Sequence, residues 1–572
     1  MFLVAITKDE IAHKLQSVII EEFKINSWIV TIVTDSFLSR CIDDPEGFSV
    51  IESPLTSSSN FRDVIFSQVT YNKRHRDTLE IYKSVLSGRA IYYYISPKGD
   101  FFCSTHISLL RKAGVPIKEN IKVLPEFFVY RCIAPPNTLY DNIYQLLPGG
   151  RLHLKMINDK CKIVHIDNFI PPTPSNTYDK DIKTTSQDII NLLNTSLQTL
   201  EPCKDRFSVL LSGGLDSSIL CKLCQMNYGV DTTYSTGFPF EDPGKNIEKE
   251  YALSAADALQ VKHKYYEPTI EQYLHGFIDG ISIAEEPLHH LQSILLYLLS
   301  RNGIPKTKDI VVNGIGADIL FGTSLHSSLF FAEKFKLLSH YPFSKILKIA
   351  SHVMNKGQSQ INLSNRTHFQ LSDHRNIIWS LGAYGDEEWV LQHFDVVRND
   401  IIEKRYRSIK EFEDKSIYDI ITLLGLFRMV PAYLCIWSNL SGSHGKIMYY
   451  PFNNIDLINY IFSIPWKIKL KSPKHVLRAV AQELNIPKFI IARPKASFGI
   501  ISNRWHKKGG VFDPLIPLAS KVFDEKEIRN MQSSNPKKGM AFWNILNYSI
   551  WKRLYINNEP VRVLVEELND AI

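Results

Sequence analysis

The chain has 572 residues, of which 44% are hydrophobic, 11% aromatic and 22% charged, and its formal net charge is +7. These values are typical of globular proteins and exclude a disordered, collagen-like or coiled-coil protein. The net positive charge is small, and the sequence contains no run of five or six basic residues, so composition does not support nucleic-acid binding.

The length indicates more than one domain and allows large cores without disulfides or metals. The eight cysteines are scattered, unlike the disulfide framework of a small secreted protein. The N-terminus lacks the basic start and long apolar region of a signal peptide. No stretch of about 18 apolar residues predicts a membrane span. We therefore expect a cytoplasmic protein.

Short β-rich runs separated by turn signals characterise residues 1–165. They predict strands at 28–34, 91–95 and 151–154. We expect an α+β domain dominated by antiparallel sheet. Residues 166–180, with three prolines among polar residues, disfavour both helix and central strand, and we predict a linker there.

After the linker the hydrophobic period becomes helical, with apolar residues at 189, 193, 197 and 200. Strands and helices then alternate, which predicts parallel βαβ units in an α/β domain over 181–572. From about residue 324 the chain is predicted to be mostly helical. The predicted elements are strands at 207–211, 232–236 and 309–313, and helices at 217–226, 248–259 and 288–300.

The heptapeptide Ser212-Gly-Gly-Leu-Asp-Ser-Ser218 lies between a predicted buried strand and a helix. A parallel sheet binds ligands at this place, beyond the carboxyl ends of its strands. Two glycines let the backbone approach an oxyanion, and the N–H groups of the following helix favour a phosphate. A carboxylate, Asp216, suits a phosphate loop when Mg²⁺ lies between the two.

A second glycine-rich turn, Asn313-Gly-Ile-Gly-Ala-Asp-Ile-Leu-Phe-Gly322, follows the predicted strand 309–313 and carries one acid, Asp318. If the two strands are neighbours, Asp216 and Asp318 meet at one edge of the sheet. Two carboxylates there could bind Mg²⁺ against a pyrophosphate.

The heptapeptide resembles the pyrophosphate loop of the ATP pyrophosphatase superfamily. The second turn is similar to the GxGAD-x-LFG element of asparagine synthetases and of their relatives, the β-lactam synthetases. Further blocks that resemble asparagine synthetases are found at 234–238, 250–252, 474–478 and 486–499, and in the N-terminal region at 108–114, 135–140 and 146–150.

This resemblance implies a degenerate, Ntn-hydrolase-like glutaminase domain followed by an adenine-nucleotide α-hydrolase-like synthetase domain that uses ATP and Mg²⁺. It assigns Asp216 and Asp318 to the metal and Lys495 to catalysis, where a lysine would stabilise oxyanions. The implied nucleotide-binding residues are Ser212, Gly213, Gly214, Leu215, Asp216, Ser217, Ser218, Gly237, Asn313 and Gly314.

Three positions depart from asparagine synthetases. Their glutaminase nucleophile is a cysteine exposed when the initiator Met is removed, but position 2 here is Phe2 and no cysteine precedes Cys41. Ile315 replaces a glutamate, or the tyrosine of β-lactam synthetases, and cannot transfer a proton. Asn454 ends a Pro-Phe-x-Asn sequence where the family usually has aspartate.

We therefore expect the amine to come from the substrate itself, so that the product is an intramolecular amide. Lasso peptide cyclases fit best: they join the N-terminal amine of a leaderless core peptide to an Asp or Glu side chain, in antibiotic biosynthesis. The expected partners are this precursor peptide and a leader peptidase or leader-binding protein. A β-lactam-synthetase-like enzyme, an RNA-modifying enzyme and an inactive nucleotide-binding homologue are the alternatives.

Overall fold

The computed structural model describes most of the chain. The residues outside this description are 13–14, 16–18, 26–27, 35–38, 45–46, 53–66, 73–77, 86–87, 159, 172–177, 199, 239–246, 324, 328, 331–378, 380–384, 408, 494–504 and 534.

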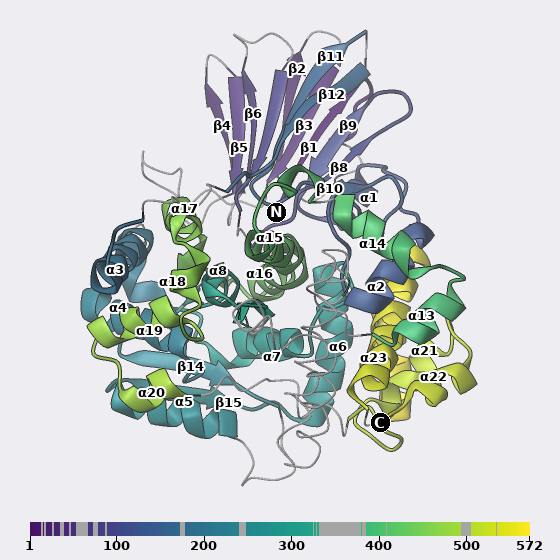
Figure 1. Cartoon of the computed structure of the whole chain (residues 1–572). Helices are drawn as coiled ribbons and strands as arrows, with labels where there is room; N and C mark the ends of the chain where they lie inside the picture. The colour runs from purple at the N-terminus through teal and green to yellow at the C-terminus, as the bar shows by residue number, and fades with distance from the viewer. Residues whose placement is uncertain are drawn as a thin grey trace, which may run out of the picture.

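Two six-stranded antiparallel sheets form the N-terminal part of the protein and lie at the top of Figure 1. Their facing sides are apolar and enclose one core, to which Phe2, Trp28, Val50 and Leu152 contribute. The first sheet has the order β10 (Tyr144–Gln145), β8 (Tyr92–Ile95), β9 (Phe101–Ser104), β1 (Phe2–Thr7), β3 (Trp28–Thr34) and β2 (Ile19–Ile25). The second has the order β12 (Lys160–Asp167), β11 (Arg151–Ile157), β7 (Thr78–Lys83), β6 (Ser67–Asn72), β5 (Gly47–Glu52) and β4 (Ser39–Asp44).

The three strands predicted in this region are confirmed: β3 has the predicted bounds, β8 is one residue shorter and β11 extends three residues further. The antiparallel sheets match the expected α+β organisation, whereas the Ntn-hydrolase relationship stays a prediction. Strand β12 continues two residues into the segment predicted as a linker, and α3 (Ile182–Gln198) begins after it. The division into domains stays a prediction.

A five-stranded parallel sheet forms the centre of the second part, with the order β15-β14-β13-β16-β17. The predicted alternation of strands and helices is therefore confirmed. The strands are β13 (Phe207–Leu210), β14 (Thr232–Thr236), β15 (Lys262–Tyr266), β16 (Ile310–Val312) and β17 (Ile447–Tyr449). The helices between the first four are α4 (Leu215–Tyr228), α5 (Ile247–Ala258), α6 (Ile270–Ala284) and α7 (Gln292–Leu298).

Helix α7 begins four residues later than predicted. The backbone N–H of Leu288 donates to Asn547 Oδ1 at 2.9 Å, and its carbonyl accepts from Asn547 Nδ2 at 2.5 Å. Both groups are thus taken by a side chain 259 residues away. An apolar pattern cannot reveal such a contact.

The described remainder of the chain is mostly helical, as predicted, apart from strand β17. Its α-helices are α8 (Ala317–Phe321), α13 (Glu387–His393), α14 (Arg398–Arg407), α15 (Ile417–Met429), α16 (Ile436–Gly442), α17 (Ile455–Ser463), α18 (Trp466–Lys469), α19 (His475–Glu483), α20 (Lys488–Ala492), α21 (Ile516–Ala519), α22 (Glu525–Met531), α23 (Pro536–Trp551) and α24 (Val561–Ala571).

Helices α15 and α16 join through a π-helical turn into one helix, Ile417–Gly442. By length and composition this helix could cross a membrane, so the expectation that no stretch would pass this test was wrong. Its apolar window is 93% buried inside the protein, and α16 contacts α6 and α7. These contacts are those of a core helix.

The turn that follows α6 joins the two parts of the protein. The Glu285 carboxylate accepts the backbone N–H groups of Ile107 (2.5 Å) and Ser108 (3.2 Å), at the start of α1 (Ile107–Lys112). The next residue, Glu286, accepts the Tyr92 hydroxyl of β8 at 2.7 Å. Burial raises the pKa of Glu285 to about 7, although the N–H groups oppose this.

We expect the Glu285 carboxyl to make stability depend on pH. Its pKa is about 7 in the folded protein and about 4.3 in an unfolded chain. The folded state therefore binds the proton more tightly, so stability is highest below the unfolded pKa and falls as pH rises to about 7. Glu285→Gln cannot titrate. The difference in unfolding free energy between wild type and variant should shrink by on the order of 3 kcal/mol from pH 5 to pH 8.

Urea denaturation at several pH values measures this difference. Glu126, whose pKa burial also raises to about 7, titrates in both proteins and cancels in the comparison. A difference that stays constant from pH 5 to pH 8 would contradict the assignment.

Candidate nucleotide and metal site

The phosphate-loop candidate connects β13 to α4 at the carboxyl edge of the parallel sheet. Gly214 is extended and directly precedes α4, so Leu215 begins the helix two residues earlier than predicted. The Ser217 hydroxyl accepts the N–H of Ser212 at 3.2 Å and donates to the carbonyl of Gly214 at 3.1 Å. The two serine hydroxyl oxygens are 3.2 Å apart. The hydrogen bonds of Ser212 and Ser217 therefore hold the loop in its conformation, whether or not these residues also contact a ligand.

Space around two glycines of the site is limited, and at Gly213 it excludes a side chain. Gly213 has φ +70°, and a Cβ there would lie 2.3 Å from the carbonyl oxygen of Tyr251 at the start of α5. A Cβ on Gly314 would lie 3.3 Å from the backbone nitrogen of Ser217. The first loop is thus closely covered by α5 and by the second loop.

The second loop leaves β16, the neighbour of β13. Asn313 donates its backbone N–H to the Tyr449 carbonyl at 2.9 Å, and its side-chain oxygen accepts the N–H of Ile315 at 3.0 Å. Gly316 has φ +108° and precedes α8, which carries Asp318 in its first turn. The side chain of Ile315 is partly buried in the core and offers no group for proton transfer.

Lys474 joins the two predicted metal ligands. Its Nζ lies 2.8 and 2.6 Å from the two carboxylate oxygens of Asp216, and 2.6 Å from Oδ1 of Asp318. Burial lowers the pKa of Lys474, but the two carboxylates outweigh this effect and leave it raised. Lys474 precedes α19 and has a left-handed backbone, with φ +52°.

The arrangement fits a divalent cation that arrives with a nucleotide. Within the described ranges, no group of three or more His, Cys, Asp or Glu side chains could bind a metal by itself. Asp216 and Asp318 nevertheless converge on one cationic group. Mg²⁺ is commonly bound by one or two carboxylates together with substrate phosphates and water. These two residues would hold it, with Lys474 moving aside.

Arg493 attaches the C-terminal segment to the phosphate loop. Its guanidinium donates to the Ser212 carbonyl at 3.0 Å and to Glu248 at 3.1 Å, and lies 3.7 Å from the ring centre of Tyr251. Lys495, the predicted catalytic residue, lies two residues further along the chain, outside the described residues. Its role stays a prediction.

The structure thus brings together nine of the ten nucleotide-site candidates around two adjacent loops, namely residues 212–218, Asn313 and Gly314. Gly237, the tenth, follows β14 at the same edge, where a Cβ would lie 1.8 Å from the Tyr265 hydroxyl. Sequence reasoning missed Lys474 and Arg493. Both belong to segments that resemble the family, but nothing local marks them as partners of the loop.

The N-terminal part has no nucleophile at position 2. Phe2 is fully buried between the two sheets, and its backbone nitrogen donates to Thr105 Oγ1 at 3.0 Å. This residue is therefore part of the core.

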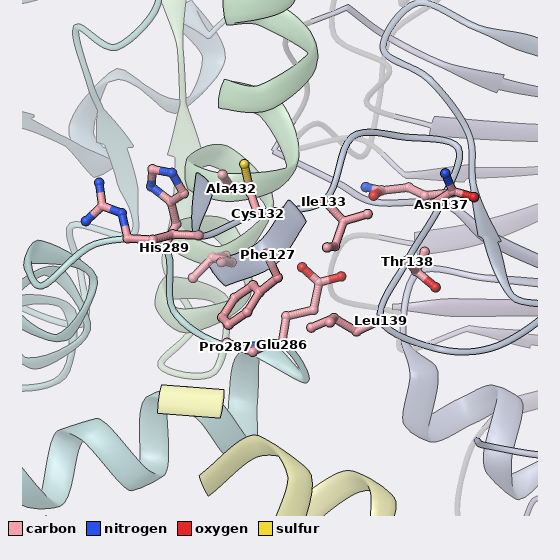
Figure 2. A pocket seen from close by; sticks show the side chains of 13 residues that line it. Phe127, Cys132, Ile133, Asn137, Thr138, Leu139, Glu286, Pro287, His289 and Ala432 are labelled. Atoms are coloured by element: carbon pink, nitrogen blue, oxygen red, sulfur yellow. The ribbon is translucent and has the colours of Figure 1, made fainter. Parts of the chain in front are cut away.

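A small cavity lies near this region, where the turn after α6 meets α2 (Leu124–Tyr130) and α16. The Glu286 carboxylate points into it, between Ile133 and Leu139 (Figure 2). Its volume of about 30 Å³ fits about two water molecules, so it cannot hold a nucleotide.

We expect Gly213→Ala to disrupt the loop, since it combines a left-handed backbone with a clash against Tyr251. Gly229, at the end of α4, is a matched control: its φ is +65°, but a Cβ there meets nothing within 4 Å. Gly229→Ala should lower the free energy of unfolding by about 1 kcal/mol and leave nucleotide binding unchanged. Gly213→Ala should lower the free energy of unfolding by roughly 2–4 kcal/mol and weaken binding of a fluorescent ATP analogue. Equal effects of the two variants would contradict the steric argument.

We expect Lys474→Met to strengthen metal binding in the absence of nucleotide. Without the ammonium, the two carboxylates repel each other and attract a divalent cation more strongly. Mn²⁺ affinity, measured by electron paramagnetic resonance, should rise about tenfold, a change of ~1.4 kcal/mol. Exposed Lys471, replaced by Met, is the control and should leave affinity unchanged. Unaltered Mn²⁺ affinity in a folded Lys474→Met protein would refute the shared site.

No curated protein matches the chain. The family model described as asparagine synthase matches residues 193–554, which include both loops, Lys474 and Arg493. This match covers more than half of the chain. The protein belongs to the asparagine synthase family, whose members are ATP-dependent, AMP-forming carbon–nitrogen ligases.

Proposed function

We propose that the protein is a macrolactam synthetase of the lasso cyclase kind. It activates an Asp or Glu side chain of a leaderless precursor peptide and joins it to the N-terminal amine of the same peptide. One observation carries the proposal: the ATP site retains Asp216, Asp318 and Lys474 in contact, whereas the glutaminase position is the buried Phe2. An enzyme that keeps activation but has no ammonia source needs an amine from its substrate.

The bonds balance in two steps. A carboxylate oxygen of the substrate attacks the α-phosphorus of ATP, and pyrophosphate leaves. The peptide amine then attacks the acyl carbon, loses a proton and releases AMP. Magnesium, when bound at Asp216 and Asp318, would neutralise charge on the pyrophosphate.

The residues of this chain would bind and orient the reacting groups. The backbone N–H groups at the start of α4 favour the pyrophosphate oxygens, because the helix N-terminus is the positive end of its dipole. Lys474, displaced from the carboxylates, would place its ammonium on the same phosphates. Lys495 would stabilise the oxyanion of the tetrahedral intermediate.

Alternatives fit less well. A β-lactam synthetase would need a proton-transferring group at position 315, where this chain has isoleucine. An inactive homologue would have no reason to keep two carboxylates and a lysine in one partly buried contact. We extend the proposal to a cytoplasmic reaction and to a leader peptidase or leader-binding protein that delivers the peptide.

The test uses synthetic peptides with free N-termini, taken from short reading frames beside the gene, and ATP. We expect AMP and pyrophosphate, and a product lighter by one water that lacks a free α-amine. Lys495→Met should lower turnover by ~10²–10³, since loss of an oxyanion donor has this effect. Lys488→Met, at an exposed position of α20, is the control and should retain activity.

Three results would overturn the proposal. They are formation of ADP in place of AMP, a product that keeps its free N-terminus, and product formation that depends on glutamine. Full activity of a Lys495→Met protein would refute the role of that lysine alone.

A further inference from the structure

A groove remote from the ATP site opens at one side of the N-terminal sandwich. Its volume is about 540 Å³, within the range of ligand sites. It lies between an edge strand of each sheet, since Tyr144 belongs to β10 and Ile163 to β12. The lining residues are Tyr93, Tyr94, Ile95, Pro97, Pro136, Asn142, Tyr144 and Ile163.

As far as the structure describes the chain, the outer edge of β12 is free along part of its length, whereas that of β10 is occupied, because the backbone N–H of Gln145 donates to the Pro136 carbonyl at 2.8 Å. In the described part of the chain, β12 pairs only with β11, and β10 pairs only with β8. The start of β12 is covered, because the N–H of Cys161 donates to the Gly99 carbonyl at 2.8 Å. The later part is exposed and combines apolar Val164 (45% exposed) and Ile166 (39%) with the polar residues His165 and Asp167. An unpaired edge strand of this kind can accept an extended peptide as an additional strand.

The groove surface is aromatic and can form hydrogen bonds. The rings of Tyr93 and Tyr144 lie 5.7 Å apart, and Tyr144 is 40% exposed. Among the described residues, no hydrogen-bond partner is found for the hydroxyls of Tyr93, Tyr94 and Tyr144. Tyrosine and proline surfaces next to a sheet edge are typical of peptide-binding grooves, where rings contact side chains and hydroxyls contact the backbone.

The rim of the groove is basic. Exposed Lys98 follows the lining residue Pro97, and exposed Lys162 precedes Ile163. Exposed Lys160 packs against the turn at Gly99. Three acids lie near. The Asp100 carboxylate accepts a hydrogen bond from the Ser96 hydroxyl, which in turn accepts the backbone N–H of Asp100. Asp141 accepts one from Asn142, and Asp167, at the end of β12, accepts from His153 and His165. Exposed Lys155 lies opposite Lys162 in the sheet, so four lysines face three acids, of which Asp167 is paired with two histidines. The groove therefore favours a negatively charged ligand.

We infer that this groove binds an extended, acidic segment of the peptide substrate, remote from the residues that form the ring. The inference rests on the proposed function for the identity of the peptide. Binding energy from a remote segment would position the reacting end at the ATP site.

The binding test needs no nucleotide and no substrate. Two fluorescein-labelled twelve-residue peptides serve as probes, one alternating Val and Glu, the other alternating Val and Lys. By fluorescence anisotropy, the wild type should bind the Val–Glu peptide at least ~10-fold more tightly than the Val–Lys peptide. Lys160→Glu combined with Lys162→Glu should reverse this preference. The same change at exposed Lys507 and Lys508 is the control and should leave it unchanged.

A second variant places the binding in the groove. Tyr144→Ser removes a ring without changing charge and should weaken Val–Glu binding about fivefold to tenfold. Equal binding of both peptides by the wild type would overturn the inference. A preference that survives the charge reversal, or Val–Glu binding unaffected by Tyr144→Ser, would do the same.

Kinetics separate this inference from the proposed function. With a peptide that the wild type cyclises, the Lys160→Glu and Lys162→Glu protein should show a KM raised about tenfold and an unchanged kcat. A wild type that cyclises no peptide, yet shows the charge-dependent binding, would count against the proposed function. Peptide-dependent AMP formation without charge-dependent binding would overturn the inference about the groove and leave the proposed function standing.

Discussion

The contact of one ammonium with two carboxylates organises the synthetase half of this protein. Asp216 and Asp318 come from helices that follow two neighbouring parallel strands, and Lys474 arrives from a third region more than 150 residues further along the chain. Without a cation between them, the two acids would repel each other. The helix that Lys474 precedes, α19, contacts α3, α4 and α8, so the ion pairs and the packing fix the same arrangement.

Close backbone contact is the second constraint at this edge of the sheet. Gly213 lies against α5 at a distance that excludes a side chain, and Gly314 lies close to the start of α4, where a side chain would be tight. Arg493 then holds the C-terminal segment on the Ser212 carbonyl. The N-terminal part is tied to this assembly through Glu285 and Glu286, although position 2 has become part of its core. The N-terminal part is therefore fixed to the rest of the protein by buried contacts.

Much of the fold was predictable because local sequence determines it. Runs rich in β-branched residues gave β3 and β14 with their observed bounds, the first followed by Asp35-Ser36 and the second by Gly237. Glycine-rich turns followed by acids placed Asp216 and Asp318 at one edge, since neighbouring parallel strands end there. The helix Ile417–Gly442 was missed because Arg428, Pro431 and Asn439 interrupt its apolar pattern, while its burial comes from neighbouring helices.

The parts that could not be predicted depend on distant contacts. The sequence around Lys474 does not reveal that its ammonium meets two loops, nor does that around Arg493 reveal its carbonyl partner. The same holds for the start of α7, which Asn547 determines from α23. The family resemblance identified these segments as relevant, and only the three-dimensional arrangement assigned them partners.

The most direct test of the central claim is anomalous diffraction from crystals grown with Mn²⁺ and an ATP analogue that cannot be cleaved between its α- and β-phosphates. We expect an anomalous peak between Asp216 and Asp318, with the Lys474 ammonium moved onto the phosphates. A bound analogue with no metal at these carboxylates, and with Lys474 still bridging them, would contradict the central claim.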